Sequence, residues 1–418
     1  MNLMAYLLAF FSLIAGCLLF ARLKWPYSYF LLLFPQLLIG ALSPLLALIG
    51  VAGAFLGWLV DAPLAIVAGL TGAVLLAIYI RKVTAPQAGF ERAFGADWSR
   101  KISLPQTRTM LRRRWTPWLQ HKGNPQWERD IAFWSVPPGD RKLLCDLWLP
   151  PSEVARTGEV FVYFHGSSWS MFDKDFGTRP FFRHLTSQGH VVMDVAYRLC
   201  PEVDIYGMIG DVKRAIAWIK TNARKYDADP ERVVVGGASA GGQLALLAAY
   251  APLLPQLTPE DVSGCDLNVR GVVSYYGPAD LGAVYAYTNQ SKLIGLPRVI
   301  IGQPVPAGRN NGARYAGRLD VLLGGHLNEI PAVYELASPI THVHPNCPPT
   351  LLIHGAQDVA IPVSSTRALY HNLVKAGVPV VMLIYPQTNH AFDLLFPQVS
   401  PPAQAALFEL DRFLMLMQ

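Results

Sequence analysis

The hydrophobic and polar positions of the chain follow two different patterns. Long uncharged apolar runs fill most of the first 80 residues, whereas from about residue 126 short apolar runs alternate with amphipathic stretches. A run of about 20 apolar residues is long enough to cross a bilayer, and short apolar runs between helices are typical of buried strands. The pattern predicts a transmembrane region over 1–82, a linker over 83–125 and an α/β domain over 126–418.

Three uncharged segments are predicted to be transmembrane helices, at residues 3–21, 36–59 and 62–80. No Lys or Arg precedes the first, and further apolar sequence follows at once, so a retained helix is favoured over a cleaved signal peptide. Residues 29–60 are too many for one upright span and too few for two. Because Pro35 and Pro44 lie inside this stretch, we expect a single kinked or tilted helix there.

Positive charge near the spans predicts the side of the membrane that the α/β domain occupies. Arg22 and Lys24 lie between the first two spans, and the pair Arg81-Lys82 follows the third. With three spans both positions fall on one side, and an excess of Lys and Arg marks the cytoplasmic side. We therefore expect an integral membrane protein with an external N-terminus and a cytoplasmic α/β domain. A re-entrant hairpin over 29–60 would reverse this orientation.

Composition and charge support the same division. The chain is 52% apolar and 15% charged, against about 45–50% and 25% in average soluble domains, which excludes a disordered chain. The net charge of +6 is concentrated in residues 81–122, where ten Lys and Arg residues oppose Glu91 and Asp97. Because this basic segment follows the apolar region, anionic lipid is a better partner than nucleic acid; a solvated basic linker is the alternative. The five cysteines are scattered without a C-x-x-C pair, so no metal site or disulfide framework is indicated.

The α/β domain is predicted to be a mostly parallel sheet covered by helices on both faces. Residues 131–136 and 143–149 flank a Pro-Pro-Gly-Asp turn and are expected to form an antiparallel hairpin. Further strands are expected, with helices between them, at 160–166, 190–197, 232–239, 269–277, 348–355 and 378–386. Residues 280–345 interrupt this alternation as an insertion, a candidate cap or wall of a substrate pocket.

The segment Gly237-Ala238-Ser239-Ala240-Gly241 is a Gly-x-Ser-x-Gly motif between a predicted strand and a predicted helix. This context is that of a nucleophile elbow, in which a tight turn presents the serine hydroxyl at the N-terminus of the helix. The alternative is an ordinary strand–helix turn with a capping serine. The position of the motif favours Ser239 as a catalytic nucleophile.

A serine nucleophile needs a general base that is itself oriented by a third group. The chain order expected for this architecture is Ser, then Asp or Glu, then His. Asp358 and His390 each follow a predicted strand, at the edge of the sheet where such sites form. We expect His390 to accept and return the Ser239 proton and Asp358 to orient the imidazole. Of the competing carboxylates, Asp194 lies within a strand and Asp211 near a helix start, where capping is the expected role.

The loop that follows the strand at 160–166 is a candidate oxyanion hole. Its sequence is His165-Gly166-Ser167-Ser168-Trp169. The backbone N–H groups of Ser167 and Ser168, together with that of Ala240, are the candidate donors, and Gly166 is a further candidate. Trp169 is expected to contact the substrate.

Several motifs in order resemble those of a known superfamily. They are HGSSW (165–169), YRLCPE (197–202), DPER (229–232) and GGASAGG (236–242). Over about residues 143–393 the chain resembles the hormone-sensitive-lipase-like carboxylesterases of the α/β-hydrolase superfamily, with motifs HGGGW, YRLAPE and GDSAGG. The resemblance implies an α/β-hydrolase fold and ester hydrolysis through an acyl-enzyme. Ala238 replaces the usual acidic residue, two serines replace glycines, and the segment around Asp358 is more similar to feruloyl esterases and isoprenylcysteine methylesterases.

These observations predict a membrane-anchored serine carboxylic-ester hydrolase that uses no metal and no organic cofactor. The predicted anchor and the basic segment favour a small-molecule or lipid ester that partitions into the bilayer. One alternative is an acyltransferase with the same triad. Another is a non-catalytic membrane scaffold on a hydrolase fold, against which the complete set of Ser239, Asp358 and His390 argues. The acyl length and the oligomeric state stay open.

Overall fold

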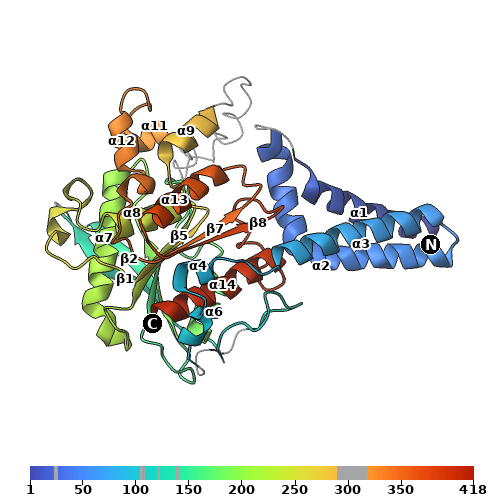
Figure 1. The fold of residues 1–418 in the computed structure, drawn as a ribbon, viewed down its shortest axis with the longest axis horizontal. Helices are drawn as coiled ribbons and strands as arrows, with labels where there is room; N and C mark the ends of the chain where they lie inside the picture. The colour runs from blue at the N-terminus through green and yellow to red at the C-terminus, as the bar shows by residue number, and fades with distance from the viewer. Residues whose placement is uncertain are drawn as a thin grey trace.

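The computed structural model describes residues 1–22, 27–103, 107, 109–120, 123–137, 139, 141–289 and 318–418. Within these residues a bundle of three long helices projects from an α/β domain (Figure 1). Lys24 and the central part of the insertion expected at 280–345 lie outside the described residues.

The α/β domain is built on one sheet, whose described strands follow the order β1-β2-β4-β3-β5-β6-β7-β8. The strands are β1 (Gln126–Val136), β2 (Arg141–Leu149), β3 (Val160–Phe164), β4 (Val191–Ala196), β5 (Val233–Ala238), β6 (Gly271–Tyr275), β7 (Thr350–Gly355) and β8 (Val380–Tyr385). β2 pairs antiparallel with both β1 and β4, and every other neighbouring pair is parallel. The hairpin and the mostly parallel sheet are as the sequence predicts, although β1 begins at Gln126 instead of 131.

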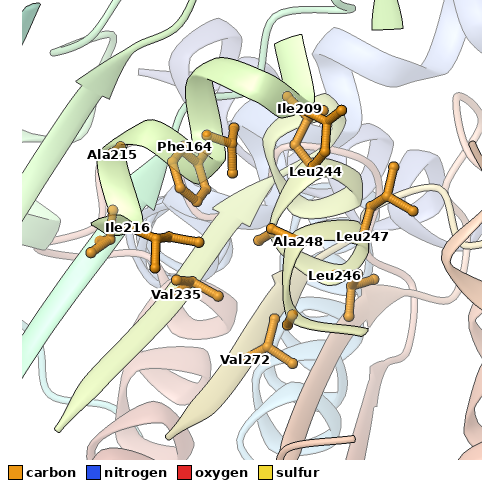
Figure 2. Close-up of a cluster of buried hydrophobic side chains, with 14 of the residues drawn as sticks. Phe164, Ile209, Ala215, Ile216, Val235, Leu244, Leu246, Leu247, Ala248 and Val272 are labelled. Carbon is orange, nitrogen blue, oxygen red and sulfur yellow. The ribbon is translucent and has the colours of Figure 1, made fainter. Parts of the chain in front are cut away.

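Helices cover both faces of the sheet. One face carries α7 (Ile205–Asn222), α8 (Ala240–Tyr250) and α13 (Val363–Lys375), and the other carries α6 (Arg179–Ser187) and α14 (Pro401–Met417). Alternate residues of β3 divide between the two cores, with Phe164 in the first and Phe161 in the second. This division is expected for a strand that is buried on both sides. Figure 2 shows side chains from α7 and α8 meeting those of β3, β5 and β6 in the first core.

The projecting bundle consists of α1 (Asn2–Phe20), α2 (Tyr27–Leu59) and α3 (Pro63–Val83). Each helix contains an apolar stretch long enough to cross a membrane. α2 begins at Tyr27, earlier than the expected start at 36, and continues through Pro35. Leu33 and Leu37 in its first half are buried in the second core, a cluster that contains residues of α1 and α3 as well as of the α/β domain.

The bundle is closely packed and joined to the α/β domain. A Cβ on Gly53 of α2 would lie 2.5 Å from the backbone nitrogen of Ala9 in α1, so these helices touch at their backbones. α14 contacts both α2 and α3. Four short helices complete the described α-helices: α4 (Phe90–Phe94), α9 (Leu281–Asn289), α11 (Leu319–Leu323) and α12 (Pro331–Leu336).

Candidate active site

Ser239 lies in a strained turn between β5 and α8. Its backbone has φ +51° and ψ −120°, a conformation that is rare for residues other than glycine. Two glycines make the turn possible. A Cβ on Gly237 would lie 2.5 Å from the carbonyl oxygen of Phe164, and one on Gly241 would lie 2.0 Å from the same atom. The start of α8 therefore packs directly against the end of β3, with the serine held between them.

Three side chains from distant segments meet at the carboxyl edge of the sheet. His390 Nε2 lies 3.1 Å from Ser239 Oγ, and His390 Nδ1 lies 2.8 Å from Asp358 Oδ2. Asp358 follows β7 and His390 follows β8, whereas Ser239 follows β5. The three residues that the sequence singled out thus form one continuous hydrogen-bonded series from carboxylate to imidazole to hydroxyl.

The Asp358 carboxylate is buried and surrounded by donors. Its Oδ1 accepts hydrogen bonds from the backbone N–H groups of Ala360 and Ile361, each at 2.8 Å. Its Oδ2 lies 3.1 Å from His354 Nε2 in addition to the contact with His390. Burial by itself raises the pKa of Asp358, but the two histidines outweigh it and hold the pKa well below its usual range. The carboxylate therefore stays ionised.

Asn389 is a site residue that the sequence analysis did not find. Its Oδ1 accepts the backbone N–H of His390 at 2.8 Å and that of Val359 at 3.1 Å. One amide oxygen therefore ties the loop that carries His390 to the loop that carries Asp358. The position of Asn389 directly before a candidate catalytic histidine was the available signal, but its partners are set only by the folded loops.

The loop at 165–169 lies against Ser239. A Cβ on Gly166 would be 3.5 Å from the Ser239 Cβ atom. Among the residues that the structure describes, the backbone N–H groups of Ser167, Ser168 and Ala240 donate no hydrogen bond to another residue. Such unpaired donors beside a nucleophile are what an oxyanion hole requires.

Three side chains of the same loop, those of His165, Ser167 and Trp169, are buried in the protein. Trp169, the residue expected to contact substrate, is 5% exposed, and its Nε1 donates to Gln243 Oε1 at 3.1 Å. Its contact with substrate stays a prediction. His165 is buried with its ring stacked on that of Tyr197, with 4.5 Å between the ring centroids. Burial lowers the pKa of His165 to about 4, so this ring is neutral at physiological pH.

The competing carboxylates have structural partners. Asp194 in β4 is buried and accepts the backbone N–H of Asp175 at 2.7 Å. The expected capping role of Asp211 is wrong, because α7 begins at Ile205 and its N-cap is Asp204. Asp211 instead forms an ion pair inside the domain with Arg198, at 2.7 Å. Within the described parts of the chain, no group of three or more His, Cys, Asp or Glu is placed to hold a metal ion.

Comparisons with known proteins agree with this architecture. The BD-FAE family model matches residues 145–373. The probable carboxylic ester hydrolase LipM of Mycobacterium tuberculosis is 31% identical over 60% of this chain and 53% of its own length. Esterase LipQ of the same organism is 30% identical over 62% of this chain and 56% of its own length. The chain therefore spans little more than half of the length of these curated relatives.

A solved structure shows the fold. Esterase B from Lactobacillus rhamnosis has a TM-score of 0.54 and 22% sequence identity, and the match covers 71% of this chain and 88% of that chain. Together with the mostly parallel sheet, this likeness shows an α/β-hydrolase fold, as the sequence motifs implied.

Proposed function

Because this chain belongs to the BD-FAE family, we propose that it hydrolyses carboxylic esters through an acyl-enzyme formed on Ser239. One observation carries the proposal: His390 lies within hydrogen-bonding distance of both Ser239 Oγ and Asp358 Oδ2. A serine hydroxyl in contact with an oriented imidazole is an activated nucleophile.

The proposed reaction proceeds in two steps. In the first, Ser239 Oγ attacks the ester carbonyl carbon while its proton passes to His390 Nε2. The tetrahedral intermediate collapses when His390 returns this proton to the departing alkoxide, which leaves as an alcohol. In the second, water gives a proton to His390 and attacks the acyl carbon; the new tetrahedral intermediate collapses when His390 returns this proton to Ser239 Oγ, which frees the serine and releases the carboxylic acid. The ionised Asp358 stabilises the imidazolium formed in both steps.

We propose that backbone N–H groups bind the negative charge on the carbonyl oxygen. The N–H groups of Ser167, Ser168 and Ala240 are unpaired among the described residues, and Gly166 borders Ser239. Ala240 is also the first residue of α8, where the helix dipole favours negative charge. Donors fixed in advance stabilise the transition state without reorganisation.

We further propose that α1, α2 and α3 anchor the enzyme in a membrane. Many large apolar side chains on these helices are exposed, among them Phe11, Leu48 and Val67, and contact with lipid would remove them from water. Arg81 and Lys82 in the last turn of α3 begin the basic segment and favour a cytoplasmic α/β domain. An anchored enzyme favours a lipophilic ester that partitions into the same bilayer.

Covalent labelling of the full chain in detergent tests the proposed chemistry. A fluorophosphonate probe should label the wild-type protein, and Ser239→Ala should abolish labelling. The matched control is Ser263→Ala, because the Ser263 hydroxyl is exposed and bonds only the Glu260 carbonyl among the described residues. Absence of labelling in the wild type would favour a scaffold, and labelling retained by Ser239→Ala would contradict the assignment of the nucleophile.

Turnover of esters with graded acyl length tests the substrate class. We expect hydrolysis of the panel, with a preference for longer acyl chains when the protein is in lipid vesicles. Addition of an alcohol acceptor separates hydrolysis from acyl transfer, because a transferase would convert the substrate mainly to the new ester.

The orientation in the membrane is tested with a cysteine added after Gln418, in a chain from which the five native cysteines have been removed. A thiol reagent that cannot cross the membrane is then applied to intact cells. Labelling of the added cysteine would contradict a cytoplasmic α/β domain.

A further inference from the structure

We propose that Gln36, a residue of the anchor helix α2, is a positioning residue for His390 and acts through Asn389. The inference rests on the proposed function and extends it, because it makes the anchor part of the catalytic apparatus. Its starting point is a buried hydrogen bond between the two side-chain amides: Asn389 Nδ2 donates to Gln36 Oε1 at 3.1 Å.

The Asn389 amide has a fixed orientation that matters for the site. Its oxygen accepts the N–H groups of His390 and Val359, so its nitrogen must point the other way. A flipped amide would place its NH2 group against two N–H donors. The side chain is only 2% exposed, and water cannot replace a lost partner easily.

Gln36 supplies the acceptor that this orientation requires. It is 4% exposed, and its Nε2 donates to the carbonyl oxygens of Leu18 at 3.0 Å and Ala21 at 3.1 Å, at the end of α1. These carbonyls lie at a helix C-terminus, where the last carbonyl oxygens lack i+4 partners; the Leu18 oxygen also accepts the N–H of the cap residue Ala21 at 3.3 Å. These three hydrogen bonds fix the side-chain amide of Gln36 in one orientation, with its oxygen directed at Asn389. A single amide side chain within an otherwise apolar helical stretch is costly unless it is paired in this way.

A second contact joins the anchor to the same loop. The Tyr79 hydroxyl near the end of α3 lies close to the side chain of Thr388, the residue before Asn389. Gly40 of α2 leaves room for that hydroxyl, because a Cβ there would lie 2.8 Å from the Tyr79 oxygen. Two anchor helices thus reach consecutive residues of the loop that carries His390.

The physical consequence concerns the placement of the imidazole. Loss of the Gln36 acceptor leaves a buried NH2 group on Asn389 unpaired, and the loop can relieve this only by turning the amide or moving away. Either change releases the N–H of His390. Because a displacement of about 1 Å at a reacting group can lower the rate by up to about 10²-fold, we expect an effect on turnover from a residue that touches no substrate.

The decisive variant is Gln36→Met in the full-length protein, which keeps the side-chain length and removes the hydrogen bonds. With p-nitrophenyl butyrate as a water-soluble substrate, kcat should fall about tenfold while KM stays within about twofold. Ser43→Ala is the matched control, because Ser43 is a buried polar residue of the same helix whose hydroxyl bonds only the Gly40 carbonyl among the described residues. Unchanged kcat in Gln36→Met would overturn the proposal.

Two further variants separate positioning from a merely structural role. Gln36→Glu keeps an acceptor for Asn389 but loses donors to α1, so it should retain more activity than Gln36→Met. If the two variants lose equal activity, Gln36 serves only to join α1 to α2. In Asn389→Ala, adding Gln36→Met should lower kcat no further, since the effect passes through Asn389. Independent, additive losses would contradict that route.

Hydrogen exchange of the full chain gives a readout that does not depend on ester hydrolysis. Gln36→Met should increase exchange in peptides covering 387–392 and 358–361, relative to Ser43→Ala. Unchanged exchange in both peptides would overturn the positioning role even if the wild type hydrolyses esters. Increased exchange in a protein without hydrolysis or probe labelling would instead sustain the coupling and reject the proposed function.

Discussion

The hydroxyl groups of Ser167 and Tyr197 lie 2.7 Å apart beneath the loop that borders Ser239. Tyr197 donates to the carbonyl oxygen of His165 at 2.7 Å, so the Ser167 hydroxyl is the donor in the bond between the two. The Ser167 oxygen in turn accepts the backbone N–H of Trp169 at 3.0 Å. The first serine of this loop therefore shapes the backbone with its side chain while its own N–H stays unpaired among the described residues.

Tyr197→Phe should loosen this loop without changing its apolar packing. The variant leaves the His165 carbonyl and the Ser167 hydroxyl without their buried partner, which costs about 1–3 kcal/mol of folding free energy. We expect a lower melting temperature and slower fluorophosphonate labelling, because displaced N–H donors stabilise the oxyanion less well. Tyr206→Phe is the control, since Tyr206 is exposed. Equal labelling rates in Tyr197→Phe and wild type would argue against the loop as an oxyanion hole.

Ser168 has a backbone conformation that a glycine would adopt more easily. Its φ of +46° lies in the left-handed region, which costs a residue with a Cβ about 1–2 kcal/mol. Ser168→Gly removes this strain but increases the conformational entropy of the unfolded chain. A net gain of up to about 1 kcal/mol in folding free energy is therefore expected. Ser168→Ala should show no such gain, because alanine keeps the Cβ. The comparison is made by denaturant unfolding in detergent, and equal stability of the two variants would contradict the strain argument.

Local patterns were sufficient to predict the sheet and the order of the candidate triad. Short apolar runs marked the strands, and Ser239, Asp358 and His390 each followed one of them, so parallel topology brought them to one edge. The contact between Gln36 and Asn389 could not be predicted in this way. It depends on how α2 packs against the α/β domain. The periodic pattern of apolar residues in a sequence does not indicate which distant segments pack together.

Two features that differ from the expectation also depend on contacts between distant segments. Residues 27–35 of α2 precede the helix expected at 36–59, and the observed helix continues through Pro35 with Leu33 buried in the second core. A capping role is predicted for Asp211 because it lies near the expected start of a helix, but α7 begins at Ile205. The ion pair of Asp211 with Arg198 is a contact between a helix and a loop, which the order of residues alone does not indicate.

The buried His165 ring should make the protein sensitive to acid. Its pKa is lowered to about 4 in the fold, against about 6.5 in the unfolded chain, so the unfolded state binds more protons between these values. Stability is therefore full above pH 6.5 and declines by up to about 3 kcal/mol as the pH falls to 4. His165→Phe removes this titration and should flatten the fall in melting temperature. His190 has a similarly lowered pKa, so part of the decline should persist. Parallel profiles for wild type and His165→Phe would contradict this account.

Asp358→Asn should impair turnover far more than it changes the fold. An asparagine oxygen can still accept the N–H groups of Ala360 and Ile361, but its NH2 group would face His390 Nδ1 and favour the wrong tautomer of the imidazole. We expect kcat to fall about 10³–10⁴-fold, with Asp97→Asn, an exposed position in the linker, as the control.

The lowered pKa of Asp358 adds a stability test with a defined sign. The folded carboxylate binds its proton less readily than the unfolded one, so its contribution to stability is present above about pH 4 and disappears as the pH falls further. The difference in melting temperature between wild type and Asp358→Asn should therefore be largest near neutral pH and shrink below pH 4. A difference that grows on acidification would mean that the carboxylate is not held ionised by His390 and His354, and would remove the electrostatic support that the proposed imidazolium requires.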